Sequence, residues 1–398
     1  MSDAAEIQAL ETEYLLQVYK RIPIVLSRGE GSHLYDTEGQ PYLDFVSGLG
    51  VASMGHANPE LAAALAEQAR TLLHTSNLYF HPLQGQVGKR LSDLSGLARV
   101  FFCNSGTEAV EGCLKFARRY WYTQGVENRT RFVALERSFH GRTLGALSTT
   151  SEPGYRAPFA PLLDVTFVSP DDPAAIDAAL TDEVAAIIVE PIQGEGGVWP
   201  LSTGVAEAIA AGCKRSGTLL IADEIQCGLG RTGAAFYSAT LGLHPDLMPL
   251  GKALGGGVPI GAVLMSQAVA DAVSPGDHGT TYGGNLLSCR AALVFLDMLE
   301  RGGLERVAVA GERLGQGLEK LAARHDVVRE VRGAGLMRGI EMTEEAAMAV
   351  VAGAQDRRLL VNRTGGNVVR LLPPLTVSDN EIDRALEVLE EALVAHTG

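Results

Sequence analysis

The 398-residue sequence lacks long apolar runs, a basic excess and an even set of cysteines. No apolar run approaches the roughly 20 residues that span a bilayer, and the acidic N-terminal segment has no basic flank before an apolar core. We therefore expect neither a membrane protein nor a secretory signal. The 33 basic residues are outnumbered by 47 acidic ones, for a net charge of −14. Because nucleic acids are bound mainly by clustered lysine and arginine, this balance argues against a nucleic-acid partner.

Cysteine is scarce as well. The five cysteines form no CxxC pair, which argues against a zinc site, and their odd number argues against a disulfide framework. They are Cys103, Cys113, Cys213, Cys227 and Cys289. We expect buried, reduced thiols, no bound metal and a cytoplasmic protein.

Glycine, in contrast, is abundant, with 46 residues. Many of these glycines cluster at 194–197, 228–233, 255–257 and 283–284. Such clusters indicate places where the backbone turns sharply or approaches a ligand closely.

The length predicts two structural units. Between residues 59 and 299, helical patterns alternate with the apolar runs RVFFC, RFVALE, VTFVS, VAAIIVE, TLLIADE and GAVLMS. Runs that are apolar on both faces and separated by helices predict the buried strands of a mostly parallel sheet flanked by helices. We expect an α/β fold with a large domain over 56–300 and a small α+β domain formed by 1–55 and 301–398.

Both chain ends show mixed patterns. The N-terminal end predicts a helix over 4–20 and a hairpin that turns at 37–40. The C-terminal end predicts strands VVREVRG and LMRGIEM, a hairpin over LLVNRTGGNVVRLLP and a last helix. Ser378, with Glu381 three residues later, is a capping-box pattern for that helix.

Ser105, Gly106 and Thr107 follow the RVFFC strand and begin a predicted helix. Free backbone N–H groups and the helix dipole bind anions there, and the two hydroxyls could add hydrogen bonds to a phosphate. An ordinary helix cap explains the same residues equally well.

Asp223 directly follows the apolar strand TLLIA, at the sheet edge where open α/β folds bind ligands. A buried carboxylate there favours a protonated pyridine nitrogen, and Gln226 could bind a ring hydroxyl. The nearby glycines at 228, 230 and 233 match the dinucleotide pattern G-x-G-x-x-G, but Asp223 and Glu224 would repel a pyrophosphate. We therefore do not predict a dinucleotide site.

Lys252 is the only charge in the apolar, glycine-rich stretch MPLGKALGGGVPIGAVLM. Desolvation lowers the pKa of a lysine and makes available the neutral amine that attacks an aldehyde. A surface lysine beside a glycine loop is the alternative for an isolated residue.

Together, a phosphate cradle, a strand-end aspartate and a buried lysine in this order are the parts of a pyridoxal 5′-phosphate (PLP) site. The sequence resembles the class III aminotransferases of the fold type I PLP family over nearly its whole length. The resemblance rests on LDFVSGLGVASMGHANPEL, HTSNLYF, NSGTEA, SFHGRTLGALS, EPIQGEGGV, DEIQCGLGRTG, KALGGGVPIGAV, HGTTYGGN and NVVRLLPPL.

The resemblance implies the cofactor contacts. Gly106 and Thr107 would hold the phosphate, and Phe139 would stack on the ring. Asp223 would pair with the ring nitrogen, Gln226 with the ring hydroxyl, and Lys252 would form the covalent link. Thr281 would reach the cofactor of a neighbouring subunit, which implies a homodimer with shared active sites.

The resemblance also implies the substrate contacts. Arg142 and Arg370 would bind substrate carboxylates, and arginine suits this role because its planar fork binds them bidentately. Glu195 would pair with Arg370 and release it when glutamate arrives, while Thr280 would lie beside the substrate. His140 and His278 lack metal-ligand spacing, and we interpret both as packing or indirect positioning residues.

The implied activity is a ping-pong transfer of a terminal amine, the δ-amine of N-acetylornithine, to 2-oxoglutarate within arginine biosynthesis. Ornithine, succinylornithine, 4-aminobutyrate and carrier-linked aminoadipate-semialdehyde aminotransferases share most motifs, and an aminomutase shares the cofactor site. A non-catalytic PLP-binding regulatory module is the alternative outside enzymes. Val110, Gly251 and Leu286 depart from the usual family residues, and their effect on the substrate stays open.

Overall fold

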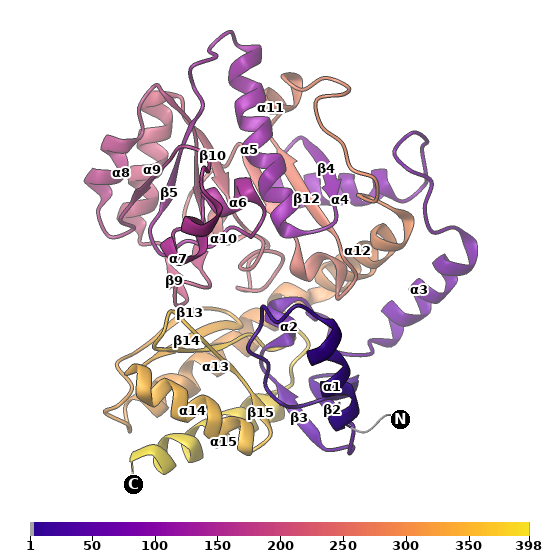
Figure 1. Ribbon diagram of the computed structural model, residues 1–398, viewed down its shortest axis with the longest axis vertical. Coiled ribbons are helices and arrows are strands. Elements are labelled where there is room, and N and C mark those ends of the chain that lie inside the picture. Colours follow the sequence, from indigo (N-terminus) through magenta and orange to yellow (C-terminus); the bar gives the residue numbers. More distant parts are fainter. Residues whose placement is uncertain (1–3, 398) are drawn as a thin grey trace.

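A seven-stranded sheet forms the centre of the larger, upper part of the computed structural model, which describes residues 4–397 (Figure 1). β12 runs antiparallel to both its neighbours, whereas all other adjacent strands are parallel. The spatial order is β4 (Arg99–Cys103), β12 (Gly261–Met265), β11 (Leu247–Leu250), β10 (Leu219–Ala222), β7 (Val184–Val189), β5 (Arg131–Leu135) and β6 (Val165–Val168). The predicted mostly parallel sheet is confirmed.

Helices cover both faces of this sheet, which explains why its inner strands β7 and β10 are apolar at every position. Along β7, Ile188 belongs to the core that includes α5 (Gly106–Thr123), while Ile187 belongs to the core shared with α8 (Pro173–Ala179) and α9 (Thr203–Ser216). All six β7 residues are buried. The alternating side chains of one strand thus fill two cores.

One element was predicted too long, and another was missed. The N-terminal helix α1 covers only Ala4–Tyr14, not 4–20, and none of its residues is buried, so no packing extends it beyond its local propensity. β11 was not predicted, since its four residues merge in the sequence with the glycine-rich stretch around Lys252.

The two chain ends form the small α+β part, seen in indigo and yellow below the central sheet in Figure 1. β15 (Leu359–Leu360) pairs in parallel with β3 (Pro41–Asp44), next to β2 (His33–Asp36) and β1 (Leu26–Glu30). A second sheet has the order β13 (Glu330–Ala334), β14 (Met337–Glu341), β17 (Val368–Leu371), β16 (Asn362–Thr364). The expected fold class is confirmed, while the domain boundaries stay a prediction.

Three long helices complete this part: α13 (Leu304–Ala322), α14 (Glu344–Asp356) and α15 (Asp379–Thr397). The predicted capping box begins α15, because Ser378 N donates to Glu381 Oε2 (2.8 Å) and Glu381 N donates to Ser378 Oγ (3.4 Å). The remaining α-helices and strands are α2 (Ser47–Gly50), α3 (Pro59–Thr71), α4 (Gln84–Ser95), α6 (Leu144–Ser148), α7 (Pro153–Arg156), β8 (Ile192–Gln193), β9 (Trp199–Pro200), α10 (Tyr237–Thr240), α11 (Gln267–Asp271) and α12 (Leu286–Met298). Among residues 4–397, no helix combines the length and the apolar character needed to cross a membrane.

Candidate active site

A cavity of about 260 Å³ opens at the carboxyl edge of the parallel strands. It lies where β10 and β11 end, at the edge where α/β sheets bind ligands. Its lining residues are Gly106, Thr107, Phe139, His140, Gly141, Arg142, Glu190, Ile192, Glu195, Asp223, Ile225, Gln226 and Lys252. Most of the residues predicted for the site therefore meet in one place.

The start of α5 forms one wall of the cavity. Ser105 Oγ accepts from Glu108 N (3.3 Å), and the Glu108 carboxylate accepts from Asn104 N (2.7 Å), so the Ser105 hydroxyl serves as the helix cap. The first N–H groups of the helix have no partner within it and are available to an anion. A Cβ on Gly106 would lie 2.9 Å from Ile225 Cγ2, so the close packing there requires glycine. Ser105 contact with a phosphate stays a prediction.

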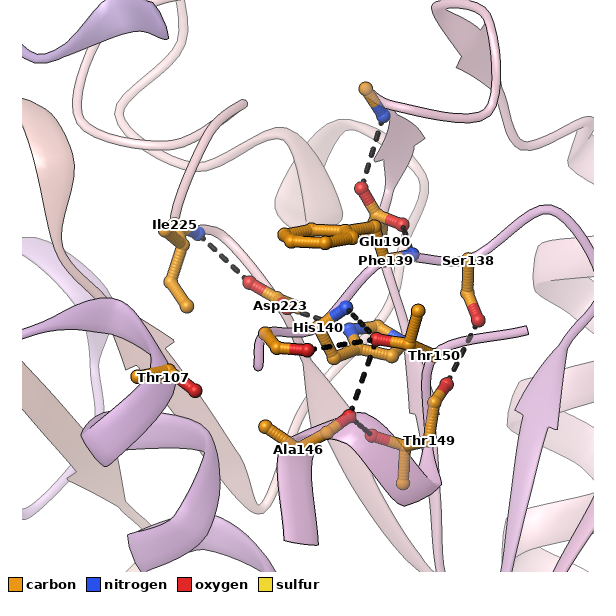
Figure 2. Close-up of polar contacts among 12 residues, drawn as sticks. Thr107, Ser138, Phe139, His140, Ala146, Thr149, Thr150, Glu190, Asp223 and Ile225 are labelled. Atoms are coloured by element: carbon orange, nitrogen blue, oxygen red, sulfur yellow. Dashed lines mark hydrogen bonds and ion pairs between the residues drawn. The ribbon is translucent and has the colours of Figure 1, made fainter. Parts of the chain in front are cut away.

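Asp223 follows β10 and is 4% exposed. Its Oδ1 accepts from Ile225 N (3.1 Å), and its Oδ2 lies 2.7 Å from His140 Nδ1. His140 N in turn donates to Thr150 Oγ1 (2.9 Å), as Figure 2 shows. The carboxylate is thus fixed by a buried imidazole, which agrees with an indirect positioning role for His140.

Lys252 follows β11 and has a φ of 41°, in the left-handed region that non-glycine residues rarely adopt. Desolvation lowers the pKa of its amine, although the Glu195 carboxylate acts in the opposite direction. Gly251 before it packs against the start of α5, where a Cβ would lie 3.1 Å from Gly106 Cα. This contact gives a physical reason for glycine at one of the positions that depart from the family pattern.

Arg370 and Glu195 form an ion pair, with Arg370 NH1 2.7 Å from Glu195 Oε1. Arg370 lies on β17, is fully buried, and also donates to Gln226 Oε1 (3.1 Å). Burial raises the pKa of Glu195, but the charge and hydrogen bond of Arg370 outweigh it and leave the pKa below its ordinary value. Arg370 does not line the cavity itself, but it contacts Glu195 and Gln226, which do.

The remaining predicted residues lie nearer the surface. The exposed Arg142 stacks 3.5 Å above the Tyr155 ring and forms no salt bridge within residues 4–397. Thr280 Oγ1 accepts from Asn104 Nδ2 (3.3 Å), while Thr281 is exposed, and neither lines the cavity. Their contacts with substrate and with a neighbouring subunit stay predictions.

Glu190 is the charged cavity residue that the sequence analysis missed. It ends the run VAAIIVE, just as Asp223 follows its own apolar strand, so the same rule could have identified it. Burial raises its pKa to about 7. Ile192 and Ile225 were missed too, and as single apolar residues they carry no signal in the sequence. Within the described residues, no group of three or more His, Cys, Asp or Glu side chains is arranged to hold a metal.

Known proteins resemble this chain over nearly its whole length. The family model described as Aminotransferase class-III matches residues 15–393. A protein of Methanocaldococcus jannaschii named acetylornithine aminotransferase is 43% identical over 384 residues, with 96% of each chain covered. One of the same name from Aquifex aeolicus is 44% identical over 382 residues, covering 96% of this chain and 100% of that one. The solved ornithine aminotransferase of Toxoplasma gondii, whose title names PLP at the active site, has a TM-score of 0.94 at 32% identity and covers 99% of this chain and 94% of its own.

Proposed function

This chain belongs to the class III aminotransferases, and from that membership we propose that it transfers the δ-amino group of N-acetylornithine to 2-oxoglutarate with PLP as cofactor. One observation carries the proposal: Lys252, Asp223 and the start of α5 surround one cavity. The relatives named acetylornithine aminotransferase, at 43% and 44% identity, support the choice of amino donor.

The cavity residues fit PLP by their chemistry. Gly106 and Thr107 would hold its phosphate at the helix start, and Asp223 its ring nitrogen. Phe139 would stack on the ring, and Gln226 would bind its hydroxyl. When bound, PLP supplies an electron-accepting ring that stabilises negative charge on the substrate carbon.

Lys252 has two tasks in this proposal. Its amine would hold the cofactor covalently until the substrate amine takes its place, and the freed Nζ would then take the proton from the substrate carbon that bears the nitrogen and deliver it to the cofactor. Asp223 would keep the ring nitrogen protonated, and His140 fixes the Asp223 carboxylate through the 2.7 Å contact. The low polarity around Lys252 favours the unprotonated amine that both tasks need.

Glu195, Arg370 and Arg142 would select the substrates. While Glu195 neutralises Arg370, a terminal amine can enter without facing a free guanidinium. 2-Oxoglutarate would displace Glu195 and bind Arg370 through a carboxylate. Arg142, which is exposed beside the cavity and free of salt bridges among residues 4–397, would bind the carboxylate of the donor.

The proposal includes a cytoplasmic homodimer that acts in arginine biosynthesis, with Thr281 of each subunit at the cofactor phosphate of the other. Five free cysteines within the described chain agree with a reducing compartment.

A panel of amines tests the proposed donor. We expect kcat/KM with 2-oxoglutarate to be highest for N-acetylornithine among N-acetylornithine, ornithine, succinylornithine and 4-aminobutyrate, measured as glutamate formed. A higher value for ornithine would assign the activity named for the Toxoplasma gondii structure instead. No turnover of any amine by the PLP-loaded protein would favour a regulatory module.

A further inference from the structure

Glu190 joins two segments that the proposed reaction uses separately. Its Oε1 accepts from Phe139 N (2.9 Å), and its Oε2 accepts from Gly194 N (3.0 Å), as the two dashed lines at Glu190 in Figure 2 show. The side chain is 6% exposed and lines the cavity. Both carboxylate oxygens are therefore engaged by backbone N–H groups.

The segment at Gly194 carries Glu195, the partner of Arg370. Gly194 packs directly against Gln226, because a Cβ there would overlap Gln226 Oε1. On its other side the segment is held by the β16–β17 hairpin, where Thr364 Oγ1 (2.6 Å) and Gly365 N (3.1 Å) donate to Glu195 O. The segment at Gly194 and Glu195 is thus held on one side by Glu190, which follows a strand of the large sheet, and on the other side by the β16–β17 hairpin of the C-terminal part.

We propose that Glu190 is a positioning residue that sets how firmly Glu195 holds Arg370, and thereby how readily a dicarboxylate takes Arg370 from it. The inference rests on the proposed function. It concerns how well Arg370 accepts 2-oxoglutarate relative to the amino donor, and not the proton transfer itself. Glu190 has no contact with Arg370 among those described and is connected to it through the backbone of Gly194 and the side chain of Glu195.

Replacing Glu190 by glutamine tests this role with little change in volume. An amide has only one oxygen to accept a hydrogen bond, and its NH₂ group would face the second N–H donor. The segment at Gly194 is then released at one end, the Glu195–Arg370 pair weakens, and Arg370 becomes more available to a substrate carboxylate.

The primary measurement is calorimetric titration of the PLP-loaded enzyme with glutarate, an unreactive dicarboxylate. We expect Glu190→Gln to bind glutarate about tenfold more tightly, the effect of weakening one charge-assisted hydrogen bond. The ratio of kcat/KM for 2-oxoglutarate to kcat/KM for N-acetylornithine should rise by about the same factor. A general loss of structure would lower both rates and leave their ratio unchanged.

Three further variants test whether the effect on glutarate binding is specific to Glu190. In the Glu195→Ala variant, Arg370 has already lost its carboxylate partner, so adding Glu190→Gln should no longer change glutarate affinity. Asp246→Asn is the matched control, because Asp246 also accepts from a strand N–H, that of Leu220 (2.9 Å), at the opposite edge of the sheet. It should leave the ratio unchanged.

Glu190→Asp keeps the charge but is too short to reach both N–H groups. It should shift the ratio in the same direction, and it replaces the glutamine variant if that variant does not fold.

Unchanged or weaker glutarate binding in both Glu190 variants would overturn the inference, as would an equal effect in the Glu195→Ala background. These outcomes differ from failure of the proposed function. If the wild type turns over another amine in place of N-acetylornithine, that amine replaces it in the ratio. Glutarate titration tests Glu190 without any turnover.

Discussion

Individual residues at the ends of neighbouring strands create the chemistry of the cavity. Asp223 follows β10 and Lys252 follows β11, and these two strands are parallel neighbours. Their carboxyl ends therefore bring an acid and an amine to the same edge of the sheet. Desolvation lowers the pKa of Lys252, and the Asp223 carboxylate is one of the charges that act in the opposite direction.

The depressed pKa of Lys252 predicts a pH dependence. In cofactor-free protein, the rate of PLP attachment should rise with pH, because the neutral amine attacks, and its midpoint should lie below the ordinary lysine value of 10.5. Since the Glu195 carboxylate raises this pKa, Glu195→Gln should move the midpoint to lower pH. Stopped-flow absorbance of the attached cofactor measures the rate. A midpoint at or above 10.5 in the wild type would contradict the claim that Lys252, with its lowered pKa, is the attacking amine.

Asp223→Asn should lower kcat by roughly 10²- to 10³-fold, the usual size of losing one preorganised electrostatic contact. An amide cannot stabilise a proton on the ring nitrogen as a carboxylate does. It would also leave His140 Nδ1 without its charged partner. Steady-state kinetics with saturating PLP measures the effect and separates it from cofactor loss. A decrease in kcat of less than about threefold would show that the Asp223 carboxylate does not stabilise a proton on the ring nitrogen.

Sequence patterns could predict the roles of Asp223 and Lys252, but for Glu190 they could indicate only a strand-end carboxylate. The first two stand out as charges beside apolar or glycine-rich runs and belong to long family motifs. Glu190 shows the same strand-end pattern, yet its importance depends on the backbone N–H groups of Phe139 and Gly194, which lie 51 residues before it and four after it. Only the folded chain brings these donors together.

At the scale of elements, the start of α5 is held in place by the strand-to-loop connection at Gly251. Gly251 is extended, with a φ of −172°, so its backbone does not require glycine. The reason for glycine is space, since a Cβ would lie 3.1 Å from Gly106 Cα and 3.2 Å from Gly106 N. Any larger residue must shift the helix start that is proposed to hold the phosphate.

Gly251→Ser should therefore weaken PLP binding about five- to tenfold, corresponding to roughly 1 kcal/mol of overpacking. Equilibrium titration followed by absorbance measures the dissociation constant. Gly204→Ser is the control, because a Cβ at Gly204 in α9 meets no atom within 4 Å. Unchanged PLP affinity in Gly251→Ser would show that the helix start adapts without cost.

Most elements could be predicted because their patterns reflect burial. The runs that became β7 and β10 are apolar at every position and are buried at every position. β11 was missed because its apolar residues continue into the glycine-rich stretch, so no local signal separates the strand from the loop after it. The predicted extension of α1 to residue 20 was wrong because this helix has no buried residue, so no packing determines where it ends.

At the scale of the whole molecule, one exposed apolar segment lies beside Thr281. Leu78, Tyr79 and Phe80 are 84%, 69% and 106% exposed, respectively. The adjacent Asn77 donates to Gly283 O (3.0 Å), which connects this segment to the loop that carries Thr281. Exposed apolar surface is typical of protein interfaces, and we therefore propose this segment as part of the dimer contact. A second copy of the chain that covers it would also bring Thr281 into the subunit contact.

Phe80→Asp should separate the proposed dimer into monomers and weaken PLP binding, because each cofactor would lose Thr281 of the other subunit. Burying a carboxylate in an apolar contact is costly, so the dimer should dissociate rather than adapt. Sedimentation velocity gives the mass, and absorbance after gel filtration gives the retained cofactor. Met348→Asp, at a residue of α14 that is 55% exposed, should change neither. If Phe80→Asp remains a dimer that retains its cofactor, the interface lies elsewhere and Thr281 has another role.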